Sequence, residues 1–168
     1  VYPVAGVEHM SRIPFSDWLH PAIEERYDAD RLPMGQTAET IARRHGVSRE
    51  EQDRFSLRSH ERAVEAMESG RFDAELVPVE TDEGVVDTDE GPRPDTSFET
   101  LHDLPTVFRD DDEASVTPGN ASPLTDGAAG MLVTSESYAE EHGLDTMARV
   151  KARAVAGVDP LVMGKGPI

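Results

Sequence analysis

The residues best suited to chemistry in this sequence lie between Thr117 and Ala129. Residues 117–122 read Thr-Pro-Gly-Asn-Ala-Ser, and residues 126–129 read Asp-Gly-Ala-Ala. Small polar side chains, two glycines and a strand built from Ala and Gly allow a ligand or another backbone to approach closely. The same spacing is equally consistent with a tight turn that leads into a core strand. Both interpretations, a ligand-binding loop and a structural turn, stay open on the sequence alone.

Other kinds of site are poorly supported. The sequence has no cysteine, and therefore no disulfide, no thiolate metal site and no cysteine nucleophile. Its six histidines never form a paired ligand pattern on a helix, so we expect no metal site. No His–Asp pairing at a recognisable spacing indicates a nucleophilic serine. We therefore expect no catalytic residue within these residues.

Composition narrows the class of protein further. A length of 168 residues fits one domain, or one domain with a large insertion. Acidic residues number 34 against 16 basic ones, for a net charge of -18, which argues against nucleic-acid binding. No apolar run approaches the ~18 residues of a membrane span, and the first residues lack a signal-peptide pattern, so we expect a cytoplasmic protein. The spread of acidic residues favours adaptation to high salt over an ordinary acidic surface.

Two helices should shape the first half of the chain. One is expected over residues 35–46. Ser48 and Glu51 form a capping box that predicts the start of a long helix, and Gly70 stands where a left-handed residue should end it. The long helix has a broad, mainly apolar stripe that predicts a buried face. Its members are Gln52, Phe55, Leu57, Ser59, His60, Ala63, Val64, Ala66 and Met67.

The remaining elements should be strands, short helices and loops. The sequence favours strands at residues 1–6, 72–79, 84–86, 127–135 and 148–156, of which 127–135 should be buried. Short helices are expected at 97–104 and 138–142, and the proline-rich residues 11–33, which include the single tryptophan, Trp18, should be irregular. The first residues resemble the end of a strand and the last are turn-rich, so we expect a segment of a longer chain.

Several motifs together resemble the thiolase family. They occur in the family's order and nearly its spacing, and the resemblance extends over essentially all of the chain. They are Met34–Glu39, Ser48–Asp53, Gly119–Ser122 with Asp126–Ala129, and Gly157–Pro160 with Met163–Pro167. Gly6–Met10 and Arg58–His60 are most similar to the 3-ketoacyl-CoA thiolases of fatty-acid β-oxidation.

The resemblance implies a partial thiolase-like α/β fold. Residues 1–10 would be a strand of the N-terminal core, residues 11–113 the loop domain over the active site, and residues 114–168 the return to the core and the start of the link to the C-terminal domain. The core would bury itself against regions outside this chain, so Met131–Val133 and Val150 should be exposed here. Family members are dimers or dimers of dimers, so a homo-oligomer is expected.

The implied activity is acyl transfer through an acyl-cysteine. The full enzyme would cleave 3-ketoacyl-CoA with CoA, or condense acetyl-CoA. The family's cysteines, its Gly-His-Pro motif and its Asn-Glu-Ala motif all fall outside this region, so the chain would supply CoA and substrate binding only and be inactive alone. The alternatives are a non-catalytic CoA- or acyl-binding module, a split subunit, or a fragment without a function of its own.

The family's ligand contacts are implied at five positions of this sequence. Arg93 would contact the adenine end of CoA, and Thr100 would be a further polar contact with the CoA. Phe108 would line the pantetheine, Ser122 would hydrogen-bond a pantetheine amide, and Met34 would border the substrate tunnel. No covalently bound cofactor is implied, since CoA and acyl-CoA are substrates.

Overall fold

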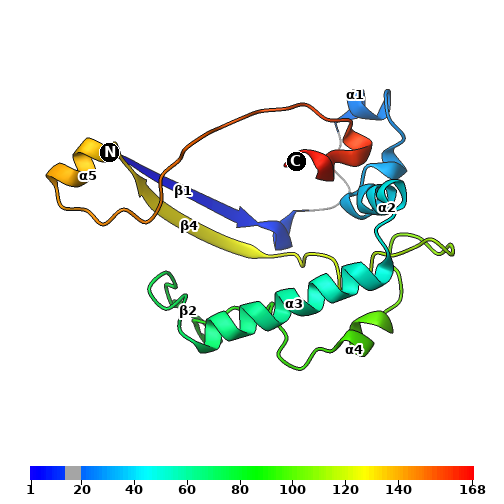
Figure 1. The fold of residues 1–168 in the computed structure, drawn as a ribbon, viewed down its shortest axis with the longest axis horizontal. Coiled ribbons are helices and arrows are strands. Elements are labelled where there is room, and N and C mark those ends of the chain that lie inside the picture. The colour runs from blue at the N-terminus through cyan, green and yellow to red at the C-terminus, as the bar shows by residue number, and fades with distance from the viewer. Residues whose placement is uncertain (14–19) are drawn as a thin grey trace. The chain divides into compact units, whose positions relative to one another are not determined.

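The computed structural model describes residues 1–13 and 20–168, which form two compact units (Figure 1). Unit 1 comprises Val1–Arg26 and Leu124–Val158, and unit 2 comprises Tyr27–Pro123 and Asp159–Ile168. Helices and strands occur in both units. Trp18, in the stretch expected to be irregular, lies outside the described residues.

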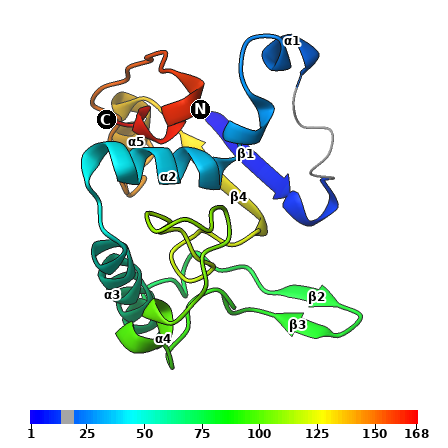
Figure 2. The ribbon, with the colours of Figure 1, turned by 90° about the vertical axis from the view of Figure 1, so that its right-hand side faces the viewer.

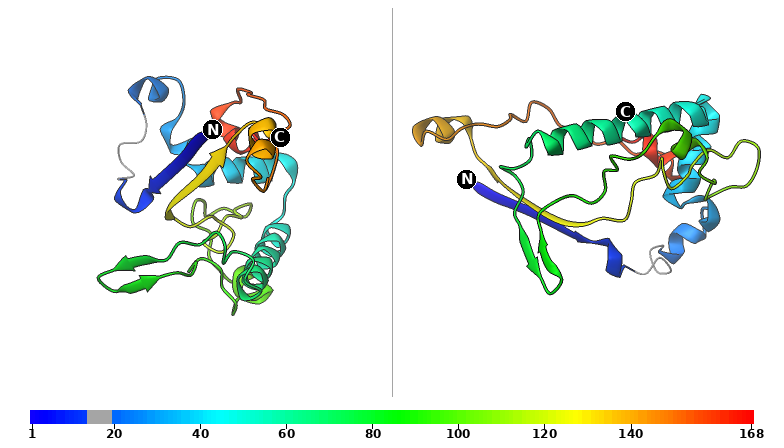
Figure 3. Two further views of the ribbon diagram at one scale, coloured as in Figure 1. Left: turned by 90° about the vertical axis from the view of Figure 1, so that its left-hand side faces the viewer. Right: turned by 90° about the horizontal axis from the view of Figure 1, so that it is seen from below.

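Unit 1 is built on a two-stranded antiparallel ribbon (Figure 3). Strand β1 (Tyr2–His9) pairs with β4 (Asp126–Val133), so that Tyr2 lies opposite Val133 and His9 opposite Asp126. Every residue of both strands is exposed. The expected strand at 127–135 is confirmed, but its burial is wrong, because among the described residues β4 pairs with β1 alone. The expected exposure of Met131–Val133 is confirmed.

The rest of unit 1 has little regular structure. It contains the short helices α1 (Pro21–Glu24) and α5 (Glu136–Glu141) and the 3₁₀ helix η1 (Met10–Arg12). The strand expected at 148–156 is wrong: these residues have no regular structure, and Val150 is 85% exposed. A strand needs a hydrogen-bonded partner, and the described residues provide none for this segment.

Unit 2 begins with the two expected helices. Helix α2 (Met34–His45) ends at Gly46, whose φ of 66° places it in the left-handed region. Helix α3 (Arg49–Glu68) opens with the complete capping box, in which the Ser48 hydroxyl accepts the Glu51 N–H and the Glu51 carboxylate accepts the Ser48 N–H. Gly70 has a φ of 70°. The boundaries of α3 predicted from the sequence are confirmed.

The expected buried face of α3 is only partly confirmed, since most residues of that face are half-buried and none is fully buried. Asp53 is the fully buried residue of this helix, and Phe55 is 63% exposed. Half-buried positions such as Leu57 and Val64 follow the side of the helix that faces α4 and the segment before it. Because few elements of unit 2 pack on α3, its apolar stripe is only partly covered.

Three smaller elements complete unit 2. Helix α4 (Phe98–His102), capped by the Ser97 hydroxyl, packs on α3 and confirms the short helix expected there. Strands β2 (Val79–Thr81) and β3 (Gly84–Val86) form a hairpin that projects as a separate arm (Figure 2). The strand expected at 72–79 is wrong, because hydrogen bonds from Glu75 and Leu76 to the Phe72 carbonyl form turns there. The 3₁₀ helix η2 (Ala29–Arg31) precedes α2. A further 3₁₀ helix, η3 (Pro160–Lys165), packs on α2.

The core of unit 2 is small and unusually polar. Its buried apolar side chains are Leu32, Ala42, Leu101, Val116 and Val162, and its buried polar or charged ones are Thr37, Glu39, Asp53, Ser115 and Thr117. Buried polar groups stabilise a fold only when their hydrogen bonds are satisfied. None of the described buried side-chain polar atoms lacks a partner. Specific hydrogen bonds therefore fix this core as much as apolar packing does.

Candidate functional site

The Thr117–Ser122 segment is hereafter called the 117–122 loop. The buried carboxylate of Glu39 holds the two residues that precede it, Ser115 and Val116. Glu39 lies on α2 and is 1% exposed. Its two oxygens accept the N–H of Ser115 at 3.0 and 3.1 Å, the Ser115 hydroxyl at 2.9 Å and the Val116 N–H at 2.8 Å. Hydrogen bonds to an ionised acceptor are the strong ones. The backbone that enters the loop is therefore fixed on α2.

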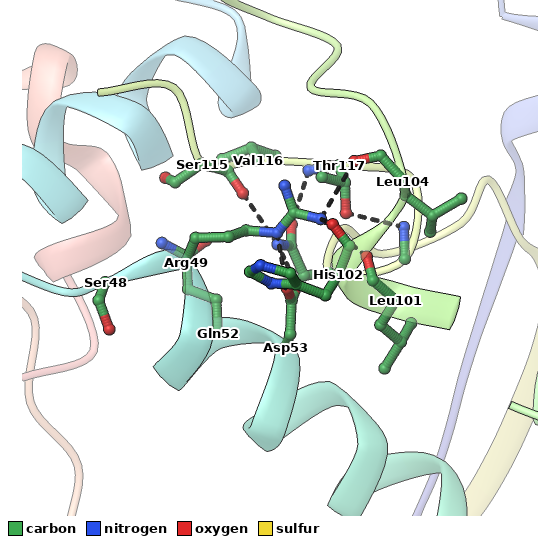
Figure 4. Close-up of polar contacts among 12 residues, drawn as sticks. Ser48, Arg49, Gln52, Asp53, Leu101, His102, Leu104, Ser115, Val116 and Thr117 are labelled. Carbon is green, nitrogen blue, oxygen red and sulfur yellow. Dashed lines mark hydrogen bonds and ion pairs between the residues drawn. The ribbon is translucent and has the colours of Figure 1, made fainter. Parts of the chain in front are cut away.

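A second buried carboxylate, that of Asp53 on α3, also contacts the loop (Figure 4). Asp53 is 0% exposed. Its Oδ2 accepts Arg49 Nε at 2.7 Å and lies 3.2 Å from His102 Nδ1, and its Oδ1 accepts Asn120 Nδ2 at 3.2 Å. Three segments distant in sequence therefore meet at one carboxylate.

Arg49 extends this cluster to α4. Its Nη2 donates to the carbonyls of Leu101, His102 and Leu104 at 2.7 to 3.1 Å. The last carbonyls of a helix lack intrahelical partners, so a cation there satisfies them and complements the helix dipole. The Arg49–Asp53 pair thus fixes the end of α4 against the beginning of α3.

Asn120 closes the loop on itself. Its Oδ1 accepts the Thr117 N–H at 2.8 Å, and its Nδ2 donates to the Ser115 carbonyl at 2.9 Å as well as to Asp53. Thr117 is 0% exposed. Ser122 is exposed, and its hydroxyl has no hydrogen-bond partner among residues 1–13 and 20–168. The loop is therefore a tightly fixed turn that leaves a free hydroxyl at its end.

Met34 is the first residue of α2, and Phe108 contacts the residue after it. Gly35 follows Met34, and a Cβ added to it would overlap the Phe108 ring, so the ring lies directly against the bare backbone. Gln36 Nε2 donates to the Phe108 carbonyl at 2.6 Å. Met34 is 71% exposed and Phe108 is 37% exposed. Both side chains therefore expose apolar surface near the beginning of α2.

Arg93 and Thr100 lie on separate segments. The Arg93 N–H donates to His60 Nδ1 at 3.1 Å, and the exposed Arg93 side chain borders a hollow of about 500 Å³ along α3. Glutamates line the same hollow, at positions Glu61, Glu65 and Glu68. Thr100 is exposed on α4, with its N–H and hydroxyl 3.1 Å from the Ser97 hydroxyl. Five expected contacts thus occupy four places: one shared by Met34 and Phe108, and one each for Arg93, Thr100 and Ser122.

An ion-pair cluster holds the acidic segment that follows Phe108. Arg43 on α2 lies 2.8 Å from Glu113 and 3.5 Å from Asp111, and Arg109 also pairs with Asp111. The hydrogen bond from Arg109 is the main reason that the pKa of Asp111 lies below its ordinary value. Exposed pairs of this kind stabilise little individually, but together they tie this segment to α2.

The motifs Met34–Glu39, Ser48–Asp53 and Gly119–Ser122 contain the residues that build the site, Glu39, Asp53 and Asn120, but sequence reasoning assigned no role to these three side chains. The hydrogen bonds between Glu39 and both Ser115 and Val116, and between Asn120 and Asp53, join residues 67 to 77 positions apart, and no local spacing indicates such pairs. One signal was available. Glu39 lies on the same helical face as Gly35 and Ala42, and an acidic side chain on a small, apolar face needs buried donors.

Two general findings limit the chemistry of the described residues. Among residues 1–13 and 20–168, no three acidic, histidine or cysteine side chains cluster in a way that could hold a metal ion. In the same part of the chain, no helix has both the length and the apolar character needed to cross a membrane.

Comparison with known proteins places the chain in a family. Residues 2–137 match the family model described as thiolase, N-terminal domain. The chain is 45% identical to a 3-ketoacyl-CoA thiolase of Erwinia tasmaniensis over 98% of its own length and 44% of that protein's. It superimposes on the dimeric peroxisomal thiolase of Saccharomyces cerevisiae with a TM-score of 0.85, at 32% identity, over 98% of this chain and 44% of that one.

A third relative was solved with a ligand. The human mitochondrial 3-ketoacyl-CoA thiolase in complex with CoA gives a TM-score of 0.78 at 33% identity, over 96% of this chain and 44% of that one. The chain belongs to the thiolase family, and the thiolase-like α/β fold expected from its motifs is confirmed. It spans less than half the length of the relatives it matches.

Proposed function

We propose that this chain forms the CoA-binding part of an acyl-CoA acyltransferase that cleaves 3-ketoacyl-CoA with CoA or condenses acetyl-CoA. The observation that supports it is the 45% identity, over nearly the whole chain, to a 3-ketoacyl-CoA thiolase. The two buried carboxylates agree with this role, because they fix a polar loop whose last hydroxyl is free for a ligand.

Five side chains would contact the substrate. Arg93 supplies a positive charge for the phosphate-bearing adenine end of CoA, which a chain with a net charge of -18 needs locally. The Ser122 hydroxyl would bond a pantetheine amide, and Thr100 would be a further polar contact. Phe108 would line the pantetheine, and Met34 the substrate tunnel, since both apolar side chains are exposed near the beginning of α2.

The covalent step would belong to residues outside this chain. Cleavage of a 3-ketoacyl-CoA by this family's route needs a thiolate nucleophile, and the 168 residues contain no cysteine. We therefore infer that these residues bind substrate, while the remaining N- and C-terminal thiolase regions supply the acyl-cysteine and its acid–base partners. The absence of cysteine equally favours the second candidate, a non-catalytic CoA- or acyl-binding module or split subunit.

Further properties follow from the same proposal. Residues 1–10 would belong to the N-terminal core and residues 11–113 to the loop domain. Residues 114–168 would return to the core and begin the link to the C-terminal domain. The full enzyme would be a cytoplasmic homo-oligomer. The excess of acidic over basic residues supports adaptation to high salt, where screening reduces self-repulsion.

Titration of the purified chain with CoA by calorimetry tests the binding role. Wild type should bind CoA, and Arg93→Ala should weaken binding by ~1–3 kcal/mol because a charge-assisted contact is lost. Arg62→Ala is the matched control, since Arg62 is an exposed arginine on α3 with no proposed ligand contact. If both variants weakened CoA binding equally, the effect of Arg93→Ala would come from the change in overall charge and not from a specific contact with CoA.

A thiolysis assay separates the two candidate functions. The chain alone should not consume acetoacetyl-CoA, and mass spectrometry should find no acyl adduct on it. Adding the remaining thiolase regions should restore turnover if the chain is part of the enzyme. A non-catalytic module would bind CoA without turnover in either case.

A further inference from the structure

We propose that Asp53 is a positioning residue for CoA binding, which acts through Asn120 on the Ser122 hydroxyl. The ligand, CoA, is taken from the proposed function, on which the inference rests. Asp53 is not one of the five residues expected to contact CoA. Asp53 does not face the ligand, because its side chain is fully buried. Its effect must therefore pass through the groups that it holds.

The two oxygens of Asp53 have different tasks. Oδ2 receives Arg49 Nε at 2.7 Å and lies 3.2 Å from His102 Nδ1, so it faces α3 and α4. Oδ1 receives Asn120 Nδ2 at 3.2 Å and so faces the 117–122 loop. One oxygen thus organises the helices, and the other reaches the loop.

The contact from Oδ1 is one of three that fix which way the Asn120 amide points, and the one made to a buried carboxylate. The amide nitrogen donates to Asp53 and to the Ser115 carbonyl, which leaves Oδ1 of Asn120 to accept the Thr117 N–H. If the amide rotated, its oxygen would face the buried carboxylate and its nitrogen the Thr117 N–H, which is unfavourable on both sides. Asp53 therefore locks the turn that ends two residues before Ser122.

The same carboxylate also fixes the helix that carries Thr100. Arg49, paired with Asp53, donates to three carbonyls at the end of α4. His102, two residues beyond Thr100, approaches Asp53 directly. The Asp53 carboxylate therefore helps to position two proposed ligand contacts that lie on separate segments, Ser122 and Thr100.

Asp53→Asn separates these tasks with almost no change of shape. An asparagine offers one acceptor oxygen, which the charged Arg49 should retain, so its amide nitrogen would face the nitrogen of Asn120. The variant should therefore release the loop while α3 and α4 stay joined. Glu51→Ala is the matched control, because it weakens the beginning of α3 through the capping box and leaves the loop contacts intact.

A double-mutant cycle with CoA as ligand tests the positioning directly. Asp53→Asn and Ser122→Ala should each weaken CoA binding roughly tenfold, whereas Glu51→Ala should leave it unchanged. In the Ser122→Ala background, Asp53→Asn should add less than about twofold, since it acts through the same hydroxyl. A full further tenfold loss in that background would overturn the inference, as would an unchanged affinity for Asp53→Asn alone.

Amide hydrogen exchange in the ligand-free chain gives a readout that does not depend on CoA. Asp53→Asn should speed exchange of the Thr117 N–H at least about tenfold, while the amides in the middle of α3 keep their rates. An unchanged Thr117 rate would overturn the positioning role even if CoA binding fell. A wild-type chain that binds no CoA would contradict the proposed function, and this exchange rate would still decide whether Asp53 locks the loop.

A second variant covers the case in which Asp53→Asn does not fold. Asn120→Ala removes the half-buried amide and leaves the Arg49–Asp53 pair in place. It should weaken CoA binding by the same factor as Asp53→Asn and speed exchange at Thr117. Wild-type affinity in Asn120→Ala would overturn the inference.

Discussion

The loop region of unit 2 and the β1–β4 ribbon of unit 1 distribute their polar and apolar groups in opposite ways. In the loop region, Glu39, Asp53 and Thr117 are at most 1% exposed and fully hydrogen-bonded. In the ribbon, Val7 is 81% exposed and Leu132 is 67% exposed. Buried polar contacts therefore hold the loop region together, whereas the ribbon leaves its apolar side chains exposed.

The difference should appear in how each region responds to substitution. Removing one partner from a buried polar cluster leaves the others unsatisfied, which costs more than the contact itself contributes. Trimming an exposed apolar side chain costs little, because it is already in contact with water.

The largest effect is expected from Glu39→Ala. It leaves the N–H groups of Ser115 and Val116 and a buried hydroxyl without an acceptor, so the free energy of unfolding should fall by about 4 kcal/mol. Urea denaturation followed by circular dichroism measures it. Glu50→Ala, which breaks an exposed pair with Arg54, is the control and should cost at most ~0.5 kcal/mol. Equal costs would contradict the importance of the buried cluster.

A matched pair of leucines sharpens the comparison. Leu101→Ala, at a side chain that is 3% exposed, should lower the free energy of unfolding by about 3 kcal/mol through lost burial and a cavity. Leu132→Ala in the ribbon should change it by less than ~0.5 kcal/mol. Denaturant titrations of both variants provide the values. A cost at Leu132 as large as that at Leu101 would mean that the ribbon is covered in solution.

The same contrast explains what the sequence could predict. Capping by Ser48 and Glu51 and the left-handed Gly70 are local signals, and they placed α3 correctly. The contact between Glu39 and Ser115 joins residues 76 positions apart, and no spacing rule reveals such a pair. The apolar residues of 148–156 suggested a strand, but strand formation depends on a partner that the segment itself does not specify.

Salt should raise the thermal stability of the whole chain, with a smaller effect than the substitutions above. Because the net charge is -18, screening should reduce self-repulsion, and the melting midpoint should rise by roughly 5 °C between low and molar NaCl. Thermal melts at several salt concentrations measure the rise, with sucrose of equal osmolality as the control for non-ionic effects. A midpoint that is flat or falls with salt would argue against salt adaptation.

Acid should have the smallest and most local effect, at the end of the ribbon. Hydrogen bonds from Ser11 hold the pKa of Asp126 below its ordinary value. A carboxylate with a lowered pKa contributes stability above its ordinary pKa and loses that contribution as the pH falls through the lowered one. NMR titration should show the lowered pKa in wild type and a pKa closer to the ordinary value in Ser11→Ala, which loses the hydroxyl but keeps the Ser11 N–H. An unchanged Asp126 pKa in that variant would exclude the Ser11 hydroxyl as the main cause.

Amide hydrogen exchange in the wild-type chain, with and without CoA, tests whether two buried carboxylates hold residues 115–117 in place before any ligand binds. The amides of Ser115, Val116 and Thr117 should exchange more slowly than those of β1 and β4, and CoA should leave their rates unchanged. Fast exchange at these three amides that becomes slow only when CoA is added would contradict this prediction.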